Sequence, residues 1–140
     1  MRRNFWTSFG QYMRPLPGAD GMAVNWLNYK TGIRQLYFRM DADKKQASVA
    51  IEMRHSDMDE QDEIFKKFET LKKMFLEIAG TDWDWELHSI DEDSKPVSRI
   101  ITRLQGVNIF NEADWPAIIS FLKPRMIALD QFWHLAKDHF

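Results

Sequence analysis

The pattern of hydrophobic and polar residues divides the chain into helix-like and strand-like segments. Apolar residues recur at helical spacing near the start, which predicts a helix over residues 4–14. Segment 22–29 is expected to form a first strand. Strict alternation in segments 35–41 and 47–55, around the polar turn 42–45, predicts a β-hairpin.

The second half of the chain opens with its clearest amphipathic pattern. Ser56 with Asp59 indicates a helix start, and apolar residues at helical spacing over 64–78 predict one helix that ends at Gly80. Alternation of tryptophans with charged residues predicts a fourth strand over 83–87.

The remaining segments complete an α+β pattern. A fifth strand is expected over 97–105, and Asp114 is the expected N-cap of the C-terminal helical region, with Pro116 in the first turn. Pro124 is expected to kink that helix or to start a second one. The predicted order is α-β-β-β-α-β-β-α, with helices flanking a mostly antiparallel or mixed central sheet in a single domain, 1–140.

Composition narrows the class of protein. The 140 residues are 44% hydrophobic and 29% charged, as in an ordinary globular domain, and there is no cysteine. The first residues carry no apolar signal region, and no stretch is long and apolar enough for a membrane span. We therefore expect a cytoplasmic protein without a membrane partner.

The net charge of −2 argues against bulk electrostatic binding of nucleic acid, although the charge is unevenly distributed. Residues 1–57 carry nine basic and five acidic side chains, whereas the rest carries ten basic and sixteen acidic ones. A basic first half could meet an acidic partner, or the two charges could cancel across one folded surface.

Several runs of residues resemble one bacterial family over nearly the whole chain. They are Trp26-Leu27-Asn28-Tyr29-Lys30-Thr31-Gly32-Ile33, Tyr37-Phe38-Arg39-Met40-Asp41-Ala42-Asp43, Asp114-Trp115-Pro116, Phe121-Leu122-Lys123-Pro124-Arg125 and Ala128-Leu129-Asp130-Gln131-Phe132-Trp133. The chain resembles domain of unknown function 4268, a family whose members often stand at the end of longer bacterial proteins, some of them nuclease-like or restriction-associated. The resemblance implies a fold and little chemistry.

The predicted order α-β-β-β-α-β is also that of the PD-(D/E)XK nuclease core, so a restriction-endonuclease-like topology is suspected. Such an enzyme needs two carboxylates that share Mg²⁺ and a nearby lysine. Asp41 and Glu52 are the candidate carboxylates, and Arg54 stands where the lysine would be. Within the hairpin, however, Asp41 lies near the turn and Glu52 on the order of 15 Å away, too far to share one metal.

Two other groups of residues are candidates for a site. Asp82, Asp84, Glu86 and His88 would share one face of the fourth strand, either as a cation site or as a solvated face. Tyr37, Arg39, Glu52 and Arg54 would share one face of the hairpin, with Arg99 and Arg103 nearby. That second group predicts a groove for a phosphate or an acidic peptide, with ordinary cross-strand ion pairing as the alternative.

The sequence leaves two functional hypotheses. The first is a non-catalytic binding or accessory module without a cofactor or metal, associated with nucleic acid or defence through its family and binding a nucleic acid or protein partner. The alternative is a metal-dependent PD-(D/E)XK-like nuclease or phosphodiesterase that uses Mg²⁺. A homodimer or a larger host complex is expected if some of the C-terminal aromatic residues (Phe121, Phe132, Trp133, Phe140) are exposed.

Overall fold

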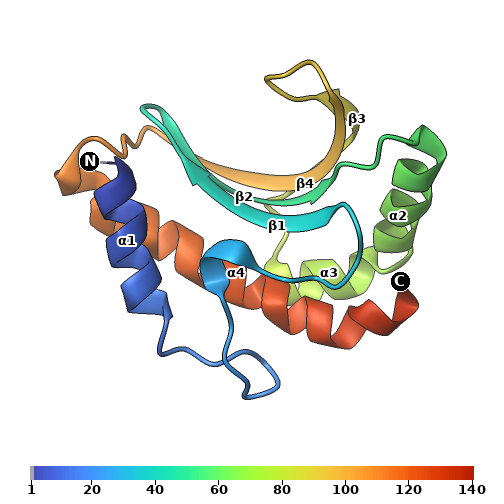
Figure 1. Ribbon diagram of the computed structural model, residues 1–140, viewed down its shortest axis with the longest axis horizontal. Helices are drawn as coiled ribbons and strands as arrows, with labels where there is room; N and C mark the ends of the chain where they lie inside the picture. The colour runs from blue at the N-terminus through green and yellow to red at the C-terminus, as the bar shows by residue number, and fades with distance from the viewer. Residues whose placement is uncertain (1) are drawn as a thin grey trace.

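The computed structural model describes residues 2–140 and shows one four-stranded sheet backed by helices (Figure 1). The strands are β1 (Leu36–Ala42), β2 (Gln46–Met53), β3 (Asp84–Ile90) and β4 (Pro96–Gln105). Their order across the sheet is β1-β2-β4-β3, and each neighbouring pair is antiparallel. The predicted α+β class, with helices flanking a central sheet, is confirmed.

The helices gather on one side of this sheet. They are α1 (Arg2–Met13), α2 (Met58–Thr70), α3 (Lys72–Ala79) and α4 (Trp115–Ala136). Helices α1, α3 and α4 lie under the sheet, and α2 stands at one end of it (Figure 1). The strands curve so that the opposite face of the sheet is concave. An antiparallel sheet can leave one face to solvent in this way.

The core lies between the sheet and the helices. Phe38, Ile51 and Ile100 form one row across three strands and are almost fully buried. The Phe38 ring packs edge-on against Trp133 of α4, with 5.6 Å between ring centroids. Each such side chain contributes about 1.5–3 kcal/mol by its burial. Phe121, Phe132 and Trp133 of α4 are all buried, so they do not supply the exposed aromatic surface on which the expectation of a dimer depends.

The strand predicted over residues 22–29 is wrong. This segment is a loop that contains a short 3₁₀ helix, η1 (Trp26–Asn28). Trp26 is buried and its indole Nε1 donates a hydrogen bond to the Leu16 carbonyl at 3.0 Å, and the Asn25 side chain caps η1. Val24, Trp26 and Tyr29 of this segment pack in or against the core without pairing to the sheet, whereas Met22 and Leu27 are exposed.

Two helix predictions also need correction. The helix predicted over 64–78 is broken at Leu71 into α2 and α3, and its N-cap is Asp57, not Ser56. At the break, the Thr70 hydroxyl donates to the Lys66 carbonyl, and the Leu71 N–H is shared between the Lys67 and Phe68 carbonyls. This tightening bends and ends α2.

The C-terminal helix, by contrast, runs through Pro124 without interruption as α4. Asp114 is its N-cap residue as predicted, but its carboxylate accepts a hydrogen bond from the Asn108 N–H and not from the helix. No helix among residues 2–140 is long and apolar enough to cross a membrane.

The missing first strand changes the comparison with nucleases. The observed order is α-β-β-α-α-β-β-α in a wholly antiparallel sheet, so the α-β-β-β-α-β order that suggested a restriction-endonuclease-like topology is not present in the described residues.

Candidate functional site

The concave face of the sheet holds a polar hollow of about 540 Å³. Its walls come from side chains that alternate with the core residues of β1, β2 and β4, and from the turn that joins β3 to β4. Five arginines and four carboxylates are among the residues that line it: Arg2, Arg39, Arg54, Arg99, Arg103, Asp41, Glu52, Asp91 and Glu92. Among residues 2–140, arginine is therefore the only cationic residue type that lines this hollow.

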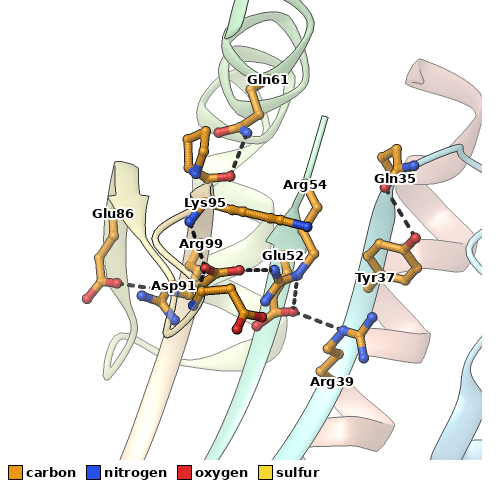
Figure 2. Close-up of polar contacts among 12 residues, drawn as sticks. Gln35, Tyr37, Arg39, Glu52, Arg54, Gln61, Glu86, Asp91, Lys95 and Arg99 are labelled. Atoms are coloured by element: carbon orange, nitrogen blue, oxygen red, sulfur yellow. Dashed lines mark hydrogen bonds and ion pairs between the residues drawn. The ribbon is translucent and has the colours of Figure 1, made fainter. Parts of the chain in front are cut away.

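Glu52 is the centre of the network at one end of the hollow. This buried carboxylate on β2 contacts the Nε atoms of Arg39 at 2.9 Å and of Arg54 at 3.0 Å. Arg54 also donates through Nη1 to the Asp91 carboxylate, at 2.7 Å. Figure 2 shows the two guanidinium groups approaching Glu52 from β1 and from the end of β2. The guanidinium of Arg39 also stacks on the Tyr37 ring, 4.5 Å from its centroid.

This network fixes the charges of its members. Burial by itself lowers the pKa of Arg54, but its hydrogen bonds to Glu52 and Asp91 outweigh burial and raise the pKa above its usual value. The backbone N–H of Lys95 and then the Arg54 guanidinium lower the pKa of Asp91. Both groups are fully charged at neutral pH.

A second ion-pair network follows β4. Arg99 donates to Glu86 of β3 at 3.2 Å and to the Ser89 hydroxyl. Arg103 contacts Asp84 at 3.4 Å and Glu86 at 3.3 Å. These distances are longer than those around Glu52, and the Arg103 contacts are too long for strong charge-assisted hydrogen bonds. The β4 arginines are thus held less firmly than Arg54.

The floor of the hollow is formed by small and apolar residues. Ala50 of β2 lies opposite Arg39 of β1 on one side and Ile101 of β4 on the other. Ser48 is the next residue of β2 on the same face as Ala50, and it lies between Asp41 of β1 and Arg103 of β4. Because Ala50 and Ser48 are short, a depression separates Arg39 from the arginines of β4.

The predicted groove residues lie together in the structure. Tyr37, Arg39, Glu52 and Arg54 share the concave face, with Arg99 directly across from Glu52. This geometry is consistent with both interpretations of the sequence, the anion groove and the cross-strand ion pairing, since the arginines are ion-paired and also line a hollow.

The residues that a nuclease would use are not assembled. Asp41 lies opposite Ser48 and contacts Arg2. Ser48 is four residues from Glu52 along β2, which separates the two carboxylates by about 13 Å. Glu52 is paired with two guanidinium groups. Across residues 2–140, no group of three or more His, Cys, Asp or Glu side chains is placed to hold a metal ion.

The group on the fourth strand, a candidate for either a cation site or a solvated face, is also dispersed. Asp82 pairs with Arg125 of α4. Burial by itself raises the pKa of Asp82, but the hydrogen bonds from Arg125, the backbone and Thr102, together with the Arg125 charge, outweigh burial and lower the pKa. A bulge between Glu86 and Ser89, where His88 has a positive φ of 54°, interrupts the alternation. His88 contacts Asp62 of α2 instead.

Sequence reasoning missed three parts of the hollow. Asp91 is 37 positions from Arg54, so only the sheet topology reveals their pairing. Arg2 reaches Asp41 from the start of α1, at 2.8 Å. Ala50 has no chemistry of its own, and only its place between two charged strands makes it a floor.

Comparison with known proteins identifies a family. The model of a family described as "Domain of unknown function (DUF4268)" matches residues 1–137. No curated protein and no solved structure matches the chain. Because the family model covers nearly all of the sequence, the chain belongs to the DUF4268 family.

Proposed function

We propose that this chain is a non-catalytic binding module whose concave sheet face binds a phosphate group. The observation that carries the proposal is the ring of arginines around a short-residue floor, on a face that no helix of the described chain covers. The chemistry is shared by small phosphate compounds and by the phosphodiester backbone of nucleic acid, so the experiment below distinguishes these two sources.

The spacing of the strands suits an anion seated over Ala50. β1 and β4 lie on either side of β2, about 10 Å apart. An anion above Ala50 would meet Arg39 from one side and Arg103 from the other. Arg103 lies across from Ser48, so its side chain would turn from its β3 carboxylates toward Ala50, and the backbone would not have to move.

The arginines have donors to spare. Arg39 is half-exposed and meets Glu52 through Nε alone, so its two Nη nitrogens point away from the Glu52 contact. Arg103 meets its carboxylates only at long distances. Planar guanidinium groups bind phosphate oxygens in pairs, which a lysine cannot do.

The structure gives the nuclease alternative no comparable support. Glu52, its best candidate carboxylate, is neutralised by two arginines, and Asp41 lies at the other end of the hollow. We therefore propose recognition of the phosphate without its hydrolysis.

Binding can be tested by calorimetry with two probes, inorganic pyrophosphate and a single-stranded oligonucleotide, and with an acidic peptide for comparison. The variant Arg39→Ala/Arg103→Ala removes both flanking charges. We expect its dissociation constant for a phosphate probe to rise roughly tenfold or more, since a hydrogen bond to a charged group is worth about 1.5–3 kcal/mol. Arg34→Ala removes an exposed arginine outside the hollow and should leave binding unchanged.

A second variant tests the hollow itself and keeps every charge. Ala50→Leu places a larger side chain on the floor and should weaken binding of the phosphate probe as much as the arginine variant does. Pyrophosphate binding without oligonucleotide binding identifies a small phosphate ligand, and binding of both points to nucleic acid. The proposal fails if neither phosphate probe binds, if the peptide alone binds, or if Ala50→Leu and Arg34→Ala bind equally well.

A further inference from the structure

The outer edge of β1 carries unused backbone hydrogen-bonding groups. Hydrogen bonds from Arg54 to Gln35 and from Asp43 to Gln46 continue the β1–β2 ladder beyond both ends of β1. In an antiparallel ladder, alternate residues point their N–H and C=O groups at the partner strand. The odd-numbered residues of β1 therefore face β2, and its even-numbered residues face outward.

Among the outward-facing residues of β1, those at the two ends of the strand have hydrogen-bond partners for their backbone groups, and those in the middle do not. The Leu36 N–H donates to the Ile33 carbonyl, its C=O accepts from the Thr31 hydroxyl, and the Ala42 N–H donates to the Asp41 carboxylate. Within residues 2–140, no hydrogen bond is formed by the backbone groups of Phe38 or Met40. The edge thus offers a short, regular template for another strand.

The other edge of the sheet is not equivalent. β3 is interrupted by the bulge between Glu86 and Ser89, and a bulge disturbs the pattern that an added strand would need. β1 keeps an unbroken register with β2 from Leu36 to Ala42.

The side chains of β1 are complementary to a second copy of themselves. If two β1 strands pair antiparallel about Met40, each Arg39 lies opposite the Asp41 of the other copy on the concave face. Met40 then lies opposite its own counterpart, beside an apolar hollow of about 240 Å³ lined by Trp6, Leu27 and Met40. Opposite charges across neighbouring strands stabilise such a register, and like charges oppose it.

We propose that the chain forms a two-fold homodimer through antiparallel pairing of β1 with β1 of a second copy, centred on Met40. Reciprocal hydrogen bonds join the two Met40 residues, and the Phe38 N–H of each copy donates to the Ala42 carbonyl of the other. Each Ala42 N–H keeps its bond to Asp41. The result is one continuous eight-stranded sheet. This inference does not rest on the proposed ligand, because its evidence is the edge of β1.

A single cysteine tests this register because the chain has none of its own. Residues in a hydrogen-bonded antiparallel pair have Cα atoms about 5.5 Å apart, within the range that a disulfide spans. Met40→Cys should therefore form a covalent dimer rapidly when oxidised glutathione accepts the electrons. Met22→Cys, a matched methionine that is 66% exposed on a distant loop, should cross-link far more slowly. Equal rates for the two variants overturn the proposal.

A charge swap tests the same register without cysteine chemistry. Sedimentation velocity of the unliganded chain should show a dimer, and Arg39→Asp or Asp41→Arg should each raise its dissociation constant roughly tenfold or more, because two like-charged pairs replace two opposite ones. The double variant Arg39→Asp/Asp41→Arg should restore the dimer. Circular dichroism confirms that each variant is folded, and the cysteine test stands if one is not. A monomeric wild type, or a folded double variant that stays monomeric, refutes the pairing.

Discussion

Replacement of Asp130 by asparagine should destabilise the fold far more than its position on a helix suggests. Asp130 lies in α4, its side chain is almost fully buried, and it accepts two hydrogen bonds and contacts one histidine. Its Oδ2 accepts from the Ala19 N–H at 2.8 Å, and its Oδ1 accepts from the Tyr29 hydroxyl at 2.5 Å and contacts His134 at 3.3 Å. This carboxylate therefore ties the long loop after α1 to the core.

The size of the effect follows from what an amide can and cannot accept. Asn keeps one acceptor oxygen, so its NH₂ group must face either the Ala19 N–H or the Tyr29 hydroxyl. A hydrogen bond to a charged group contributes about 1.5–3 kcal/mol, and a buried donor left without an acceptor costs about 1–3 kcal/mol. Relief from burying a charge offsets part of this loss. We expect Asp130→Asn to lower the free energy of unfolding by about 2–3 kcal/mol.

Urea unfolding followed by tryptophan fluorescence measures this change, and hydrogen exchange localises it. The amides of residues 15–31 should lose protection more than those of the sheet. Asp138→Asn, an exposed carboxylate near the end of the chain, is the matched control and should change stability by less than about 0.5 kcal/mol. The reasoning is refuted if Asp130→Asn costs no more than this control, or if the loop amides keep their protection.

Three further substitutions test other hydrogen-bonded polar groups. Burial and then the hydrogen bond to Asp130 raise the pKa of Tyr29. Because the unfolded state then loses the phenol proton at a lower pH than the folded state, wild-type stability should fall above about pH 10. Urea midpoints between about pH 8 and 11 should show this fall in wild type and not in Tyr29→Phe. The lowered pKa of Asp91 contributes stability that is present above about pH 4 and is lost as the pH falls through the lower folded-state value. Asp91→Asn should therefore flatten the acid side of the stability curve, while its exposed neighbour Asp93→Asn should leave that curve as steep as wild type. Gln61, fully buried in α2, bonds two carbonyls and a serine hydroxyl, so Gln61→Ala should cost about 2–3 kcal/mol in thermal or urea unfolding, and a cost under 1 kcal/mol would count against this role.

The sequence correctly predicted the elements that are specified by local patterns, such as the alternation of apolar and polar residues and the composition of a turn. The hairpin of β1 and β2 was recoverable because its two arms alternate strictly and a polar turn joins them. The same alternation placed Tyr37, Arg39, Glu52 and Arg54 on one face.

The errors arose where distant contacts decide the structure. Segment 22–29 has a strand-like composition, but the burial of Trp26 and the anchoring of Tyr29 by Asp130 hold it as a loop. Leu71 continues the helical spacing of its neighbours, and nothing in that spacing reveals the break there. The turn residue Asp91 enters the site only because β4 pairs with β2, a topology that local patterns do not specify.

The two proposals meet at Arg39. This side chain contacts Glu52 within its own chain, flanks the proposed anion position above Ala50, and would face Asp41 of a second copy at the β1 edge. Pairing of the two β1 strands would join the concave faces, so that the arginines of both copies line one continuous surface. An anion that draws Arg39 inward over Ala50 would weaken its contact with the second copy. Because binding and pairing then compete for the same guanidinium, phosphate binding should be tighter in the monomer than in the dimer, and by linkage it should favour dissociation.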